Sequence, residues 1–200
     1  INYLNNQIQD LSDYISKWSH EAKLPLASLR LMNERNENVF LKKDIRETIE
    51  RLQLLLNTML MSSKLKNPEN DIKIERIQLT QVIKEAIKHQ SYFLINKHFS
   101  IDIQFDDIYV YNDRRWLTYM LDQFIANSIK YCQESPCLIF KIIENEAITL
   151  VVEDNGIGIS KEDMPYIFDR GFVGSNLRDG DYRSTGMGLY FVKDIAKKLN

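Results

Sequence analysis

The sequence predicts an α+β protein in two parts, in which a hairpin of two long helices precedes an α/β sandwich. Two observations lead to this prediction. Apolar residues recur at helical spacing through the first third of the chain, and beyond it β-branched and aromatic runs alternate with helical patterns. A polar stretch that contains Pro68 separates the two patterns. We therefore expect a helical hairpin at 1–66, a linker at 67–73 and an α/β domain at 74–200.

The composition is that of an ordinary soluble domain. Hydrophobic residues make up 44% and charged residues 27%, and the net charge of −2 provides no basic field for direct nucleic-acid binding. The cysteines, Cys132 and Cys137, are too few for a zinc cluster or a disulfide framework, which favours a reducing, cytosolic setting. The sequence has neither an apolar run of roughly 18 residues, nor a signal peptide, nor an initial Met, so we expect the soluble fragment of a longer protein.

The first helix is predicted by an apolar stripe with alternating steps of four and three residues, which is a heptad repeat. A polar break at 33–38 leads into a second helix, expected from about Phe40 to Lys66, with an apolar stripe of its own. A hairpin with so wide an apolar face buries little of it alone, so we expect a homodimeric four-helix bundle. The first stripe consists of Leu4, Ile8, Leu11, Ile15, Trp18, Ala22, Pro25, Leu29 and Met32.

In the second part, the sequence predicts helices laid on one mostly antiparallel sheet. A long loop with three glycines separates the last strand from the last helix, and a loop of that length is typical of a functional lid. The expected strands are 74–79, 99–105, 108–111, 137–144 and 147–153, the expected helices are 80–97, 115–132 and one from Gly188, and the loop is 167–185.

Two glycine-rich turns are the first candidate site. One begins at Asp154 directly after a strand, and the other ends at Gly188, where a helix begins. Neither has the spacing of a P-loop or a dinucleotide fingerprint, and each alone is typical of an ordinary turn. Glycines nevertheless let a backbone approach a ligand closely, and a helix N-terminus directs free N–H groups at a phosphate. Asp154 offers a carboxylate to an exocyclic amine such as that of adenine, or simply closes an Asx turn.

A polar stripe on the helix before these turns is the second candidate. Gln123, Asn127 and Lys130 are spaced at i, i+4 and i+7, so their side chains share one face. Two amides and an ammonium group suit a Mg²⁺–triphosphate, because Mg²⁺ prefers oxygen ligands and water. Considered alone, the same stripe is more typical of a solvated helix face.

Taken together, these motifs resemble the GHKL ATPase superfamily, whose ATP-binding fold is known as the Bergerat fold. The resemblance covers about 74–200 and is specific, because four boxes agree in order and spacing. It implies ATP and Mg²⁺ as cofactors, Asn127 as the Mg²⁺ ligand, and a lid in which Arg170, Arg178 or Arg183 contacts phosphate. The boxes are an N box with Asn127, Lys130 and Tyr131, a G1 box with Asp154, Gly156, Gly158 and Ile159, an F box with Phe168, and a G2 box with Thr185, Gly186, Met187, Gly188 and Leu189.

The stretch from Trp18 to Pro25 in the first helix carries the remaining chemistry. His20 lies off the apolar stripe, and histidine side chains ordinarily titrate near pH 6.5, so an exposed imidazole is largely neutral and nucleophilic in the cytosol. Glu21 is placed to orient the ring or accept its proton, and Pro25 removes a helix hydrogen bond to the Glu21 carbonyl. A single exposed histidine is incidental on most helices, and Leu24 excludes the zinc-protease pattern.

This stretch resembles the H box of histidine kinases, which has His-Glu, a basic residue three positions after the His and Pro five positions after it. The resemblance implies autophosphorylation of His20 by ATP, with Glu21 as catalytic partner, and transfer of the phosphoryl group to an Asp of a response regulator. Many relatives carry Thr or Asn where this chain has Leu24, so we expect weak or absent phosphatase activity toward the regulator. The strands that close the fold in relatives are expected beyond Asn200.

Two stretches, 167–174 and 185–190, further resemble the bacitracin-sensor group of histidine kinases. That group implies a small kinase anchored at the cytoplasmic face of a Gram-positive cell membrane, with two transmembrane helices before Ile1. It also implies an antimicrobial-peptide ABC transporter as sensing partner and a role in the antibiotic or envelope-stress response. The alternatives are another GHKL ATPase, which would lack the hairpin with His20, and an inactive kinase scaffold, which would not need intact ATP boxes.

Overall fold

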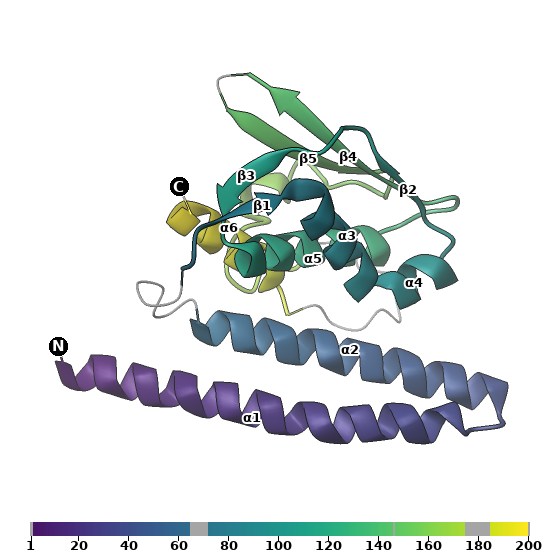
Figure 1. Cartoon of the computed structure of the whole chain (residues 1–200). Helices are drawn as coiled ribbons and strands as arrows, with labels where there is room; N and C mark the ends of the chain where they lie inside the picture. Colours follow the sequence, from purple (N-terminus) through teal and green to yellow (C-terminus); the bar gives the residue numbers. More distant parts are fainter. Residues whose placement is uncertain (1, 65–71, 146, 175–184, 200) are drawn as a thin grey trace. The chain divides into compact units, whose positions relative to one another are not determined.

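The computed structural model describes residues 2–64, 72–145, 147–174 and 185–199 (Figure 1). The chain forms two compact units, Ile1–Ile72 and Lys73–Asn200. Residues 65–71, which include the end of the second predicted helix and most of the predicted linker, and Glu146, between two predicted strands, lie outside the described residues. Within the described ranges, each helix is too short or too polar to cross a membrane.

The first unit is the predicted hairpin, formed by α1 (Asn2–Glu34) and α2 (Val39–Lys64). Helix α1 continues through Pro25. Asn38 sets the start of α2, because its side-chain Oδ1 accepts the backbone N–H of Leu41 at 3.1 Å, as an N-cap does. The predicted polar break is therefore a tight turn between the two helices.

Every seventh residue of α1 lines the seam between the two helices. Ser19, Leu26 and Asn33 are buried there, and the partly buried Ser12 continues the row. The Ser12 and Ser63 hydroxyls lie 2.9 Å apart, and the Asn33 side chain donates to a backbone carbonyl of α2 at 2.7 Å. The seam is thus polar at both ends and apolar around Leu26, and it does not use the stripe that the heptad repeat predicts.

Most members of the predicted apolar stripe of α1 whose burial is described instead face solvent in the single chain. Trp18 is 49% exposed and Met32 is 68% exposed, and α2 carries a second such row that includes Leu55 at 52%. Rows of large apolar side chains are costly to leave in water, so they have the character of an interface. We call them the exposed apolar rows: Leu11, Trp18, Leu29 and Met32 on α1, and Leu41, Leu52, Leu55 and Met59 on α2.

In the described residues of the second unit, the strands form two sheets rather than the single sheet predicted from the sequence (Figure 1). Strand β1 (Glu75–Gln78) pairs antiparallel with β3 (Tyr109–Asn112). Strand β4 (Cys137–Glu144) pairs in parallel with β2 (Ser100–Ile103) and antiparallel with β5 (Ile148–Asp154). The prediction of one sheet was wrong because strand pairing depends on contacts between distant segments, which the pattern within each strand does not reveal.

The core of the second unit lies between helices and the three-stranded sheet (Figure 1). Helices α3 (Leu79–His89) and α5 (Arg114–Lys130) cover one face of that sheet, and α6 (Gly188–Leu199) packs against α5. Ile83 of α3 and Phe140 of β4 are fully buried where the layers meet. The helix and sheet layers predicted for this part are therefore present. Their packing fixes the position of α5 and of its C-terminal end.

The single helix predicted at 80–97 is two helices, α3 and α4 (Ser91–Asn96), with Gln90 between them. Gln90 leaves the helical conformation at φ −101° and ψ 6°, and its side chain is buried. Leu94 of α4 packs into the same core as α3. Glutamine is a good helix former, so local preference does not mark this break, and the packing of Gln90 and Leu94 overrides it.

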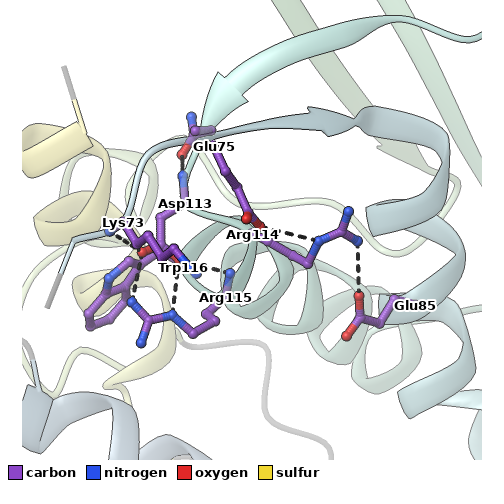
Figure 2. Close-up of polar contacts among 8 residues, drawn as sticks. Lys73, Glu75, Glu85, Asp113, Arg114, Arg115 and Trp116 are labelled. Carbon is purple, nitrogen blue, oxygen red and sulfur yellow. Dashed lines mark hydrogen bonds and ion pairs between the residues drawn. The ribbon is translucent and has the colours of Figure 1, made fainter.

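Asp113 joins the start of the second unit to the N-terminus of α5, as Figure 2 shows. Its buried carboxylate accepts the backbone N–H of Arg115 at 2.9 Å as an N-cap, and the backbone N–H of Lys73 at 2.7 Å. The Arg115 guanidinium adds an ion pair of 2.8 Å. Beside it, Arg114 lies 3.6 Å from the carboxylates of both Glu75 and Glu85.

Candidate nucleotide and phosphoacceptor sites

The C-terminal end of α5 and the turn after β5 are joined directly. The backbone N–H of Ile157 donates to the Tyr131 carbonyl at 3.0 Å. A Cβ on Gly156 would lie only 2.7 Å from that carbonyl oxygen, so glycine is required where the two backbones meet. The residues predicted as an N box and a G1 box are therefore neighbours in space.

Asp154 stands at the end of β5 with both carboxylate oxygens hydrogen-bonded. Oδ1 accepts the backbone N–H of Gly156 at 2.8 Å, which closes the Asx turn considered from the sequence. Oδ2 accepts the hydroxyl of Ser128, from α5, at 3.0 Å. Asp154 is nevertheless exposed, and each oxygen has a further lone pair. An Asx turn and a ligand-binding role are thus compatible in this one residue.

Asn127 and Lys130 lie at the same end of α5. The Lys130 ammonium is 3.1 Å from the Tyr131 hydroxyl and 4.7 Å from the centre of its ring, so the charge is held at the helix end. The half-buried Asn127 side chain has no hydrogen-bond partner among the described residues. An amide oxygen without a partner fits the Mg²⁺ ligand that the resemblance implies, because Mg²⁺ takes oxygen ligands.

Gln123, the third member of the predicted polar stripe, lies against the start of α6. A Cβ on Gly188 would collide with Oε1 of Gln123, so the Gln123 side chain packs directly against the backbone of Gly188. Helix α6 therefore begins beside the polar stripe of α5. This places the positive end of the α6 dipole beside the Gln123 amide, on the helix whose polar groups are expected to hold a triphosphate.

Gly186 ties the G2 turn to the segment after Phe168. The backbone N–H of Gly171 donates to the Gly186 carbonyl at 3.0 Å. Gly186 has a φ of +63°, and a Cβ there would lie 2.6 Å from the carbonyl oxygens of Gly171 and Phe172. Both features require glycine. The segments on either side of 175–184 are thus held together at this point.

The remaining predicted residues lie in or near these turns. Phe168 is partly buried, with the Lys193 ammonium 6.0 Å from its ring centre, and the Thr185 hydroxyl accepts the backbone N–H of Met187 at 3.4 Å. Gly158 has a φ of +72°, Leu189 is partly buried in the first turn of α6, and Ile159 and Arg170 are exposed. Arg178 and Arg183 lie outside the described residues.

His20 belongs to the first unit, where it is exposed on α1. Glu21 is exposed beside it, and Leu24, one turn further on, is 71% exposed. Ser19, its other neighbour, is buried in the seam. The imidazole is therefore accessible to a reaction partner, and the helix that carries it is anchored immediately next to it.

Sequence reasoning missed two polar side chains of the site, Ser128 and Asn155. Asn155 accepts the backbone N–H of Cys137 at 2.8 Å and donates to the Ser135 carbonyl at 3.1 Å, so it fixes the loop between α5 and β4. Both residues stand inside recognised motifs, at positions the motifs leave unspecified.

Comparison with known proteins supports both halves of this description. Residues 112–200 match the histidine kinase-, DNA gyrase B- and HSP90-like ATPase family. Sensor protein BceS of Bacillus subtilis (strain 168) is 35% identical over 192 residues, which are 96% of this chain and 57% of BceS. Sensor protein kinase GraS of Staphylococcus aureus (strain JH1) is 28% identical over 197 residues, which are 98% of this chain and 56% of GraS. The chain thus spans a little over half the length of these relatives.

The fold is also found among solved structures. The Acinetobacter baumannii histidine kinase AdeS superposes with a TM-score of 0.57 at 23% identity, covering 88% of this chain and 85% of the AdeS chain. At that identity the likeness concerns the fold alone. The helical hairpin and the α/β unit therefore occur together in a known architecture.

Proposed function

The chain has the sequence and the fold of a histidine kinase cytoplasmic core close to the bacitracin-sensor group, and on that premise we propose that it transfers the γ-phosphoryl group of ATP to His20. The observation that carries the proposal is that two backbone segments, the turn after β5 and the start of α6, both lie against α5. The turn after β5 approaches the end of that helix so closely that glycine is required at Gly156, and Gly188 at the start of α6 lies against the Gln123 side chain. Such close approach suits a site in which backbone groups surround a nucleotide.

ATP binds to the second unit in this proposal. Asp154 accepts the exocyclic amine of adenine, the start of α6 donates N–H groups to the phosphates, and Lys130 adds positive charge. Asn127 holds Mg²⁺, which neutralises charge on the triphosphate when bound. One arginine of the loop adds a further positive charge. The candidates are Arg170 and, outside the described residues, Arg178 and Arg183.

His20 supplies the nucleophile. A neutral imidazole nitrogen attacks the γ-phosphorus, a P–N bond forms, and the bond between phosphorus and the bridging oxygen breaks to leave ADP. Glu21 receives the imidazole proton as the P–N bond forms. The exposure of His20 supports this role, because ATP and then the response regulator must both reach it. The phosphoryl group finally passes to an Asp of that regulator.

Two copies of the chain pair through the exposed apolar rows to form a four-helix bundle in this proposal. The exposure of Trp18 and Leu55 in the single chain supports it, because pairing would remove both from water. The likeness to BceS and GraS supports a place at the cytoplasmic face of the cell membrane in a pathway that responds to antimicrobial peptides. An ABC transporter is the sensing partner that the bacitracin-sensor group implies.

Incubation with γ-labelled ATP and Mg²⁺ tests the proposed function. Label on the protein is expected to be acid-labile and alkali-stable, and to be absent in His20→Gln. His98→Asn is the matched control, because His98 is exposed in the second unit and has a φ of 56°, which asparagine tolerates. ATP binding without label on the wild type would favour another GHKL ATPase, and absence of ATP binding would favour an inactive scaffold.

A further inference from the structure

The Ser128 hydroxyl lies between two acceptors. It is 3.0 Å from Oδ2 of Asp154 and 3.1 Å from the backbone carbonyl of Phe124, one turn earlier in α5. The residue is only 3% exposed. A hydroxyl has one proton and donates to one acceptor at a time, and a hydrogen bond to a charged carboxylate is the stronger of the two. Asp154 is therefore the favoured acceptor.

The helix itself does not need a serine at this position. Alanine has the higher helix propensity, and a hydroxyl that only returns to the carbonyl four residues earlier slightly destabilises a helix. Burying a hydroxyl also costs free energy unless it is hydrogen-bonded. What Ser128 adds over alanine is a donor directed at Asp154.

The carboxylate of Asp154 is held from both sides. Ser128 donates to Oδ2 and the backbone N–H of Gly156 donates to Oδ1, so rotation of the carboxylate about its last bond would break both hydrogen bonds. An ionised carboxylate accepts hydrogen bonds and cannot donate them. The lone pairs that remain are therefore presented in one direction, to a ligand that carries a donor.

We propose that Ser128 is a positioning residue that orients Asp154 toward the exocyclic amine of adenine and so sets the preference for adenine over bases that lack this amine. The inference rests on the proposed function, because it takes ATP as the ligand and Asp154 as the group that reads the base. An amine at C6 donates to the held carboxylate, whereas a C6 carbonyl places one acceptor against another. A bare C6–H leaves the carboxylate without that partner.

Nucleotide binding to the whole chain in the presence of Mg²⁺ tests the proposal. ATP is compared with purine riboside triphosphate, which lacks only the 6-amino group, and the wild type is expected to bind ATP about tenfold more tightly. Ser128→Ala is expected to weaken ATP binding about three- to tenfold and to leave the analogue unaffected. Ser128→Thr keeps a hydroxyl and should retain the wild-type ratio of the affinities for ATP and the analogue. Valine has the shape of threonine without the hydroxyl, so Ser128→Val should lose this ratio.

Ser28→Ala is the matched control, because Ser28 on α1 also donates to the carbonyl four residues earlier, at 3.2 Å, and has no part in the site. Equal weakening of ATP and the analogue by Ser128→Ala and Ser128→Val would assign Ser128 a purely structural role and overturn the proposal. Equal binding of both nucleotides by the wild type would also overturn it, because Asp154 would not then read the amine. Binding of neither nucleotide would contradict the proposed function itself, so the two failures are distinguishable.

Discussion

The carboxylate of Asp113 accepts the backbone N–H of Lys73, forty residues earlier in the chain, at 2.7 Å (Figure 2). The same carboxylate caps α5 and pairs with Arg115, so one buried side chain attaches the first residue of the second unit to the helix that carries the predicted N box. Burial by itself would raise the pKa of the Asp113 carboxyl, but the hydrogen bonds from Arg115 and Lys73 outweigh it and lower the pKa below its ordinary value. The folded state thus favours the ionised form.

Replacing Asp113 is expected to destabilise the second unit, and the size of the effect depends on the residue that replaces it. Asp113→Ala removes the cap and the acceptor for Lys73, and we expect a loss of about 2–4 kcal/mol in the free energy of unfolding. Asp113→Asn keeps a capping oxygen but loses the charge, and should cost about 1 kcal/mol, because the Arg115 side chain is half exposed. Denaturant unfolding followed by the fluorescence of the buried Trp116, in a Trp18→Phe background, measures both.

Asp106→Ala is the control for these variants, since Asp106 is exposed on the same unit. It should leave the unfolding midpoint unchanged. Equal midpoints for Asp113→Ala and the wild type would show that the attachment of Lys73 contributes nothing to stability.

The pair formed by His89 and Asp122 predicts a pH dependence near neutrality. Nδ1 of His89 lies 3.0 Å from Oδ2 of Asp122. This hydrogen bond raises the pKa of His89 above 6.5 despite partial burial of the ring. Burial raises the pKa of the Asp122 carboxyl more than the contact with His89 lowers it. Because the folded state binds the His89 proton more tightly, its stabilisation is fully present below pH 6.5 and is lost as the pH rises through the raised pKa.

Thermal unfolding of the wild type and His89→Gln between pH 5.5 and 8.5 measures this dependence. The wild type should be the more stable protein at the acidic end by a fraction of a kcal/mol, since the His89 side chain is nearly half exposed, and the difference should vanish toward pH 8.5. A difference between the two proteins that is independent of pH would contradict the assignment to His89 protonation.

A comparison of Gly186 and Gly171 distinguishes two reasons for which a position requires glycine, a positive φ and a lack of space for a Cβ. Both have positive φ, +63° and +76°, but a Cβ on Gly171 would meet open space, whereas one on Gly186 would strike the backbone of Gly171 and Phe172. Gly171→Ala should therefore cost only the left-handed backbone strain, about 1–2 kcal/mol. Gly186→Ala must also displace the turn, so we expect ATP affinity to fall at least about tenfold further than in Gly171→Ala. Similar affinities of the two variants would show that the G2 turn shifts without harm to the site.

Much of this arrangement was readable from the sequence. The heptad repeat predicted the hairpin, although the seam between the two helices does not use the predicted stripe, and Trp18 and Met32 of that stripe are exposed. The glycines after β5 were predicted to allow the close approach of a ligand, and Gly156 also allows the backbone at the end of α5 to come within contact distance. These inferences succeeded because each depends on local spacing or on one residue type.

The features that sequence reasoning missed depend on contacts between distant residues. The parallel pairing of β2 with β4 and the attachment of Lys73 to Asp113 join segments tens of residues apart. The break at Gln90 contradicts local helix preference and follows from packing. Ser128 acts on Asp154 across 26 positions, and a serine inside a helix has no signature that distinguishes this contact from a bond to its own helix.

The exposed apolar rows predict that a single charge disrupts the proposed dimer. Leu55→Glu would bury a carboxylate in each of two related positions, so we expect the dimer dissociation constant to rise at least about a hundredfold. Ile95→Glu, which changes an equally apolar and even more exposed residue of α4, should leave it unaffected. Sedimentation across a concentration series measures both. An unchanged dimer in Leu55→Glu would place the interface elsewhere.

Leu24 predicts a gain of activity on substitution. It lies one turn after His20, 71% exposed, at the position where the resemblance to histidine kinases implies a residue able to hydrogen-bond a water. A leucine side chain has no such group, so the wild type should remove phosphate from its regulator slowly or not at all. Leu24→Thr introduces a hydroxyl and should accelerate that reaction at least about tenfold in the presence of ADP and Mg²⁺. Leu24→Ala, which removes bulk without adding a hydrogen-bonding group, should not. Rapid dephosphorylation by the wild type, or the same rate in both variants, would show that position 24 does not limit this reaction.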